Sequence, residues 1–264
     1  EMGADRILFS TDTHHLAERA VEGLVGTIEF VDIPLTGSQL DTVAAARTMW
    51  KAQVGAVVVL GGDGTCRDVA TGWPDAPLIA ISTGTNNVFP STVDGTTAGV
   101  AAALVATGAV PLERVGRRAK RVALRIDTPR STSVVNEHAL VEAALIDTAF
   151  VGARAVNDPA TIRWVVACIA NPASTGLASI AGRVHPVDRN EPGGVRIRLG
   201  PGGRRVRVPL APGTFTTLAV ESVELLTTSI DLPGGGVLAF DGERTTPVSA
   251  DSTITVSIEA SGPQ

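Results

Sequence analysis

The chain has 264 residues, a net charge of −5 and a sequence pI near 5.4, and 44% of its residues are hydrophobic. This acidic balance argues against nucleic acid as a partner. No apolar run approaches the ~20 residues that a membrane-spanning helix needs, and no signal peptide is evident. Two cysteines suit a reducing compartment better than a disulfide scaffold. We therefore expect a cytoplasmic protein that does not contact membranes.

The first part of the chain alternates strand and helix patterns. The run "AVVVLG" (56–61) is continuously apolar, which is typical of a central parallel strand covered on both faces. Ser38 is placed to cap a helix. The alternation predicts an open parallel sheet with helices on both sides. Strands are predicted at 6–10, 27–33, 56–61 and 77–83, and helices at 14–24, 40–54 and 96–108.

The second part of the chain is rich in strand patterns, and only 171–182 looks helical. "GPGG" (200–203) lies between two segments that alternate Arg with apolar residues, which predicts a hairpin turn. The pattern as a whole predicts a β-sandwich or flattened barrel. Strands are predicted at 121–127, 139–151, 163–170, 195–200, 204–210, 215–226, 236–242 and 253–260.

The charge also divides the chain. The first 115 residues carry 6 basic and 13 acidic side chains, whereas the rest carry 16 basic and 14 acidic ones. Such a shift indicates two domains. We expect an α/β domain over 1–112 and a β-sandwich domain over 113–264.

The sequence "GGDGT" (61–65) follows the predicted strand at 56–61. Its three glycines let backbone N–H groups approach a polyanion, and the helix that follows adds the positive end of its dipole. Asp63 would repel a phosphate unless a divalent cation lies between them or the carboxylate handles an attacking hydroxyl. A P-loop would need Lys after the glycines, and a dinucleotide fingerprint would need Gly in place of Arg67. The alternative is a glycine-rich turn capped by Asp63.

The segment "GGDGT" resembles the signature of the NAD kinase and diacylglycerol kinase superfamily, and three further segments agree with it in chain order. "STGTNNVFP" (82–90) resembles the next loop, which has a Gly-Thr-x-Asn-x-Phe core in the lipid kinases. "NPASTGLASIAG" (171–182) is similar to the Thr-Pro-Thr-Gly-Ser-Thr-Ala-Tyr-Ser segment of NAD kinases, and "FDGER" (240–244) to a lipid-kinase strand end. Overall the chain looks most like ATP-NAD kinase family proteins of the acetoin-catabolism X type.

The resemblance implies an N-terminal Rossmann-like α/β domain and a C-terminal β-sandwich, with ATP in the cleft between them. It implies phosphoryl transfer to a hydroxyl, assisted by Mg²⁺, with Asp63 as metal ligand or catalytic residue. Asp241 and Glu243 are further catalytic candidates, for which a strand-ending turn is the alternative. Nucleotide binding is implied for Gly61, Gly62, Gly64, Thr65, Thr83, Gly84, Thr85, Asn86 and Asn87, and acceptor binding for Ser174, Thr175 and Ser179.

Three other residues are candidates for acceptor binding. Asn136 and Glu137 resemble the Asn-Glu pair that grips the acceptor nucleotide in NAD kinases, although such a pair is also common in loops. Asp147 is an acid among apolar residues and requires a partner, so either a structural ion pair or a place in the site would account for it.

The sequence departs from the family pattern in two places. It begins "EMGADRILFS", which looks like the end of the helix after the first strand of the relatives, so we expect the α/β domain to lack its first βα unit. Ala178 stands at or beside the Tyr of the NAD kinase segment, which removes an aromatic platform for a base and weakens NAD as the acceptor.

These observations leave three functions. The leading one is an ATP-dependent, NAD kinase-like phosphotransferase with NAD as the default small-molecule acceptor. The alternatives are a lipid or polyol kinase of the diacylglycerol kinase type and a non-catalytic nucleotide-binding regulatory protein. We also expect a homodimer or a higher homo-oligomer.

Overall fold

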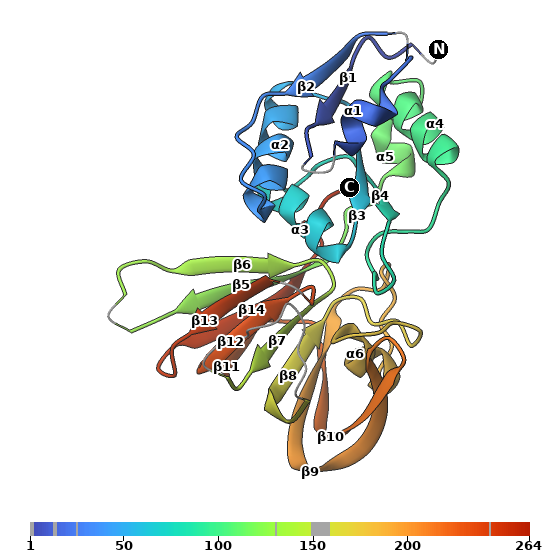
Figure 1. The fold of residues 1–264 in the computed structure, drawn as a ribbon. Coiled ribbons are helices and arrows are strands. Elements are labelled where there is room, and N and C mark those ends of the chain that lie inside the picture. The colour runs from blue at the N-terminus through green and yellow to red at the C-terminus, as the bar shows by residue number, and fades with distance from the viewer. Residues whose placement is uncertain (1–2, 13–14, 25, 130, 149–158, 243) are drawn as a thin grey trace. The chain divides into compact units, whose positions relative to one another are not determined.

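The computed structural model describes residues 3–12, 15–24, 26–129, 131–148, 159–242 and 244–264 (Figure 1). The chain divides into two compact units. Unit 1 comprises Glu1–Thr83, Pro90–Arg118 and Gly262–Gln264, and unit 2 comprises Gly84–Phe89 and Ala119–Ser261. The "STGTNNVFP" segment is therefore shared, because its first two residues and Pro90 belong to unit 1 and the residues between them belong to unit 2.

Unit 1 contains the alternating strands and helices that the sequence predicts. Ser38 caps α2 as expected, since its Oγ accepts the backbone N–H of Leu40 at 3.2 Å. The elements are β1 (Ile7–Ser10), α1 (Leu16–Ala20), β2 (Ile28–Val31), α2 (Gln39–Lys51), β3 (Val57–Gly61), α3 (Asp63–Gly72), β4 (Leu78–Ser82), α4 (Gly95–Ala106) and α5 (Leu112–Val115).

The strands of unit 1 pair differently from the prediction. Instead of one open sheet, β1 pairs in parallel with β2, and β3 pairs in parallel with β4. The prediction that β3 is covered on both faces was also wrong. Val57, Val59 and Gly61 are buried, but Val58 is 42% exposed and Leu60 68% exposed. A continuous apolar run therefore overstated how much of this strand is buried.

Unit 2 is built from two antiparallel sheets. Its strands are β5 (Arg121–Asp127), β6 (Val135–Ala139), β7 (Glu142–Ile146), β8 (Ile162–Ala167), β9 (Gly194–Ala211), β10 (Thr214–Leu226), β11 (Ile230–Pro233), β12 (Gly236–Phe240), β13 (Arg244–Val248) and β14 (Thr253–Glu259). One sheet has the order β10-β9-β8-β7-β12-β13, and the other has the order β11-β14-β5-β6. A short 3-10 turn (Pro159–Thr161) precedes β8, and helix α6 (Ala178–Val184) follows it.

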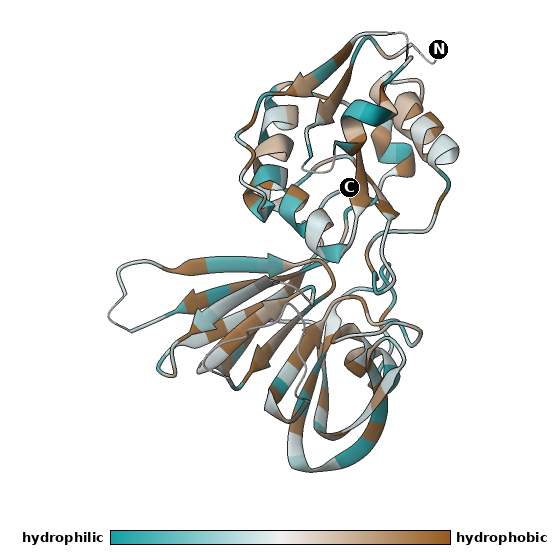
Figure 2. Cartoon of the chain, viewed as in Figure 1, coloured by the Kyte–Doolittle hydropathy of each residue, from teal (hydrophilic) through white to brown (hydrophobic). Residues whose placement is uncertain are grey.

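Two hydrophobic clusters hold unit 2 together. Leu124 and Ile254 of the four-stranded sheet share a cluster with Val166 and Phe240 of the six-stranded sheet, so this core lies between the sheets. The second cluster lies against α6 and includes Ile180. Figure 2 shows hydrophobic stretches interleaved with hydrophilic ones along these strands. The two packed sheets agree with the predicted β-sandwich.

The predicted hairpin at "GPGG" is absent, because β9 continues through residues 200–203 as one strand. The pairing of β9 with β10 shifts register there, and a Cβ at Gly203 would overlap the backbone of Val220. Gly203 therefore permits a close backbone approach rather than a turn. The chain reverses instead after Ala211, where Gly213 has a φ of +72°.

Both cysteines are fully buried, Cys66 in α3 and Cys168 directly after β8. The Cys168 thiol donates to the carbonyl of Leu140 at 3.2 Å. Burial raises the pKa of Cys168, and the nearby Asp241 carboxylate raises it further.

We expect neither thiol to react with a disulfide reagent in the native protein, because both are buried, and the raised pKa of Cys168 also suppresses its thiolate. A reagent titration at mildly alkaline pH checks this, and both thiols should react once guanidinium unfolds the chain. Rapid labelling of a cysteine in the native protein would contradict this buried assignment.

Candidate functional site

The "GGDGT" segment in unit 1 joins β3 directly to α3. Gly62 is the N-cap of α3 and supplies no side chain to the end of the helix, and Asp63 lies in the first turn. The first N–H groups of an α-helix lack partners within the helix, so this end presents donors together with the positive end of the helix dipole. A Cβ at Gly61 would lie 2.7 Å from Thr65 Oγ1, so Gly61 allows Thr65 to pack against the strand end.

Asp63 is 8% exposed, and two further charged residues of the same helix, Arg67 and Asp68, are buried with it. Arg67 lies four residues after Asp63, which places both on one helix face. In the sequence, Arg67 served only to exclude a dinucleotide fingerprint, although an opposite charge four residues after Asp63 was a usable signal. Buried charges of this kind need partners, and each of these three residues takes part in an interaction.

Asp63 is also the carboxylate at the start of α3 that could serve as a metal ligand. Among the residues that the structure describes, no group of three or more His, Cys, Asp or Glu side chains gathers to hold a metal ion. Mg²⁺ in nucleotide sites typically takes one or two carboxylates together with substrate phosphates. A single carboxylate in the first turn of α3 fits that mode of binding.

The "STGTNNVFP" segment is an excursion from the end of β4. Its base closes in unit 1, where Ser82 N donates to Ser91 O at 2.9 Å and Thr83 N donates to Gly61 O at 3.3 Å. In unit 2, Gly84, Thr85 and Asn86 are exposed. A Cβ at Gly84 would lie 3.0 Å from Asn87 Nδ2, so the Asn87 side chain folds back over this glycine.

The structure brings this segment together with the "NPASTG" segment of unit 2. Thr175 Oγ1 donates to Asn86 Oδ1 at 2.6 Å, across 89 residues of sequence. Ser174 is close in sequence, and its Oγ donates to Asn171 O at 2.7 Å. Exposed amide and hydroxyl groups from two separately predicted motifs therefore form one polar cluster.

Ser179 belongs to the same motif but lies inside unit 2. It is fully buried, and its Oγ donates to Gly176 O at 2.6 Å and to Pro209 O at 3.2 Å. These bonds account for the hydroxyl without a ligand and join α6 to β9. Its role in acceptor binding remains a prediction.

Asp241 is a buried residue that follows β12 with a φ of +49°. Its Oδ2 accepts the N–H of Leu140 at 3.0 Å, and its Oδ1 accepts those of Val141 at 2.8 Å and Glu142 at 3.3 Å. Both oxygens are thus engaged by backbone donors at the start of β7. This geometry gives Asp241 a positioning role, and its catalytic role remains a prediction. Glu243 lies outside the described residues.

Replacing Asp241 with Asn should lower the free energy of unfolding by about 1–3 kcal/mol, because one buried N–H would lose its acceptor. Asn tolerates the same backbone conformation, so the change isolates the hydrogen bonds. Denaturant unfolding measures the effect. Asp231→Asn is the matched control, since Asp231 is exposed and accepts only a hydroxyl bond from Thr255 in the described contacts. Equal stability of the two variants would contradict the role given to Asp241.

Asn136 and Glu137 lie in β6 rather than in a loop. Asn136 is exposed and pairs in register with Arg125. Glu137 Oε1 accepts the hydroxyl of Thr246 at 3.2 Å. Their part in acceptor binding remains a prediction.

Asp147 lies at the end of unit 2 opposite Asp241. Asp241 holds the start of β7, and Asp147 follows its last residue, Ile146. Four residue steps along a strand separate these ends by roughly 13 Å. Thr175 lies at the same end as Asp241, because β8 runs antiparallel to β7 and the "NPASTG" segment follows β8. The structure therefore does not bring Asp147 together with Asp241 or Thr175.

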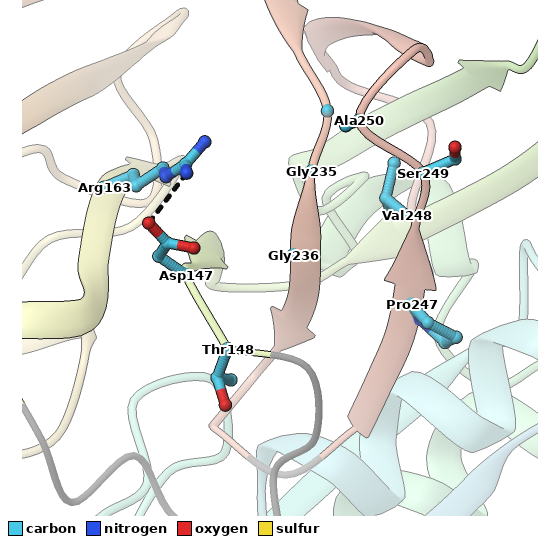
Figure 3. A pocket seen from close by; sticks show the side chains of 10 residues that line it. Asp147, Thr148, Arg163, Gly235, Gly236, Pro247, Val248, Ser249 and Ala250 are labelled. Atoms are coloured by element: carbon cyan, nitrogen blue, oxygen red, sulfur yellow. Dashed lines mark hydrogen bonds and ion pairs between the residues drawn. The ribbon is translucent and has the colours of Figure 1, made fainter.

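Asp147 instead borders a separate pocket of about 700 Å³ (Figure 3). Its Oδ2 lies 2.7 Å from Arg163 Nη2, and both side chains are about half exposed. Asp147 thus forms an ion pair with Arg163, which is one of the two explanations that the sequence left open for this acid. The pocket is lined by Asp147, Thr148, Arg163, Gly234, Gly235, Gly236, Pro247, Val248, Ser249 and Ala250.

Both parts of the chain resemble known protein families. Residues 6–110 match the family model of the ATP-NAD kinase N-terminal domain, and residues 120–261 match that of the acetoin catabolism protein X C-terminal domain. Acetoin catabolism protein X of Cupriavidus necator is 34% identical over 271 residues, which cover 97% of this chain and 75% of that protein. An uncharacterized protein of Archaeoglobus fulgidus is 36% identical over 87 residues, or 33% of this chain and 29% of its own length.

Among solved structures, yeast NADH kinase complexed with NADH is similar, with a TM-score of 0.58 and 16% identity. The match covers 98% of this chain and 72% of that one. This likeness confirms the predicted NAD kinase-like fold. Among the described helices, none is long and apolar enough to cross a membrane.

Proposed function

The chain belongs to the acetoin catabolism protein X family, and from that premise we propose that it is an ATP-dependent phosphotransferase acting on a hydroxyl group. NAD is the default acceptor, because the fold is NAD kinase-like and the N-terminal part matches the ATP-NAD kinase model. The observation that carries the proposal is the start of α3. There the glycine N-cap makes no side-chain hydrogen bond to the helix end, and a buried carboxylate, Asp63, lies in the first turn.

The start of α3 suits a nucleotide phosphate for two reasons. Backbone donors and the helix dipole favour an anion there, and Gly62 adds no side chain to block its approach. Bound Mg²⁺ would neutralise the charge that develops on the transferred phosphoryl group. Asp63 would hold that ion or orient the acceptor hydroxyl, which are the two roles open to a carboxylate at this position.

In the proposed reaction the acceptor oxygen forms a bond to the γ-phosphorus of ATP. The bond from that phosphorus to the bridging oxygen breaks, so ADP leaves with the electron pair. The acceptor hydroxyl loses its proton, to Asp63 or to water. The main tasks of the protein in this reaction are therefore to position ATP and the acceptor hydroxyl and to neutralise charge on the phosphoryl group.

The polar cluster of Asn86 and Thr175 supports the proposal from unit 2. Both residues come from motifs for which the sequence predicts nucleotide or acceptor binding, and they share a 2.6 Å hydrogen bond. Exposed amide and hydroxyl groups can pair with phosphate or ribose oxygens. We propose that this cluster is a nucleotide- or acceptor-binding surface of unit 2.

A coupled ADP-release assay tests the function. The purified protein is supplied with MgATP and, in separate reactions, NAD, NADH, diacylglycerol and small polyols. Acceptor-dependent ADP release supports the proposal and identifies the acceptor class. Nucleotide binding without ADP release from any acceptor would favour a regulatory protein over an enzyme.

A further inference from the structure

The part of "STGTNNVFP" that belongs to unit 2 is fixed by more than the Asn86 contact. Val88 is buried in the cluster between the two sheets, and Phe89 packs against that cluster. The carbonyls of both residues point to one donor, because Arg189 Nη2 lies 3.1 Å from Val88 O and 3.3 Å from Phe89 O. Arg189 is about 100 residues away in sequence, so this contact depends on the tertiary fold.

Arg189 lies in the 188–193 loop, which precedes β9 and is held by hydrogen bonds of its own. Asp188 Oδ1 accepts the N–H of Asn190 at 2.8 Å, and Glu191 Oε2 accepts the N–H of Asp188 at 3.2 Å. Gly193 ends the loop with a φ of +75°, and a Cβ there would overlap the Leu226 carbonyl. The loop therefore has a defined shape rather than that of a free surface turn.

Lys120 is hydrogen-bonded to both ends of the 188–193 loop. Its Nζ donates to Asp188 O at 2.8 Å and to Gly193 O at 3.1 Å. The residue is only 6% exposed, and burial lowers its pKa below the ordinary lysine value. A buried ammonium is costly unless it is well hydrogen-bonded, and two carbonyl acceptors are provided by this loop.

These contacts form one continuous connection from Lys120 through the 188–193 loop and Arg189 to Val88 and Phe89. The Gly84–Asn87 turn, of which Gly84, Thr85 and Asn86 are exposed, directly precedes those two residues. We propose that Arg189 is a positioning residue that holds the Gly84–Asn87 turn in its nucleotide-binding shape, with Lys120 fixing the loop that carries it. The proposal rests on the proposed function, because it assumes that this turn contacts the nucleotide.

The role is not explained by stability alone. Val88 and Phe89 already pack on the core, so the segment has an apolar attachment without Arg189. The guanidinium instead restrains two consecutive carbonyls, which limits the rotation of the backbone that leads into the turn. Losing the restraint should loosen the turn more than it weakens the unit.

The test compares Arg189→Ala and Arg189→Lys with Arg205→Ala, an exposed arginine on β9 of the same unit. Hydrogen exchange of the 84–89 amides and calorimetric titration with MgATP and MgADP are measured on each, together with thermal unfolding. Arg189→Ala should speed exchange in 84–89 and weaken nucleotide binding by about 10-fold, the effect of losing a charged hydrogen bond. Arg189→Lys should recover part of both effects, while the control matches wild type.

Lys120→Met should shift both readouts in the same direction. The double variant with Arg189→Ala should add little to either single change, because both residues act through one loop. Unchanged exchange in 84–89, or unchanged affinity despite faster exchange, would overturn the positioning role. If wild-type protein binds no nucleotide, the proposed function fails too, and the exchange data still show separately whether Arg189 anchors the turn.

Discussion

Asp63→Asn should lower kcat by at least ~10²-fold, the scale of losing one preorganised electrostatic contact. Asp63 lies in the first turn of α3 behind a glycine N-cap, where a carboxylate can hold a metal ion against a bound phosphate. Asn keeps the size and one oxygen of the side chain but lacks the charge. Steady-state kinetics with MgATP and the acceptor found in the ADP-release assay give the effect.

The control for this variant is Asp32→Asn. Asp32 is an exposed acid of unit 1, so its loss changes the net charge equally without touching α3. Thermal unfolding confirms that both variants are folded. A folded Asp63→Asn protein with near wild-type kcat would remove Asp63 from the catalytic assignment.

Gly62→Val should weaken MgATP binding by ~100-fold. A valine side chain at the N-cap would stand between the first N–H groups of α3 and a phosphate, removing charge-assisted hydrogen bonds worth about 1.5–3 kcal/mol each. Gly62 has a φ of −101° and an extended ψ, which other residues adopt readily. The substitution therefore tests access to the helix end rather than backbone strain, and calorimetry measures it.

Gly95→Val is the matched control for Gly62→Val. Gly95 begins α4 of the same unit, and a Cβ there meets no atom within 4 Å. This variant should bind MgATP like wild type. Unchanged affinity in Gly62→Val would reject the start of α3 as the phosphate site.

Local sequence patterns predicted most of the elements but not how they pair. Apolar strands and the Ser38 cap were readable, because periodicity and capping depend on neighbours in sequence. The "GPGG" segment was misread as a turn, because glycine serves equally for turns and for close backbone approach. The exposure of Val58 and Leu60 in β3 could not be predicted, because both faces of a continuously apolar strand carry similar side chains.

The candidate site was predictable where a motif carries its own chemistry. The strand, glycine cap and first helical turn around Asp63 follow from "GGDGT" itself. The distance between Asp147 and Asp241 was not predictable, because it depends on the end of β7 near which each residue lies. Lys120 and Arg189 carry no sequence signal, since their partners are backbone carbonyls that any residue could supply.

A crystal structure of the protein with Mg²⁺ and a non-hydrolysable ATP analogue tests the central claim most directly. We expect the β- and γ-phosphates at the N–H groups that begin α3, with Asp63 bound to the metal ion or within hydrogen-bond distance of the acceptor position. An analogue whose phosphates lie away from residues 61–65, with Asp63 in contact with neither metal nor nucleotide, would contradict a phosphate site at the start of α3.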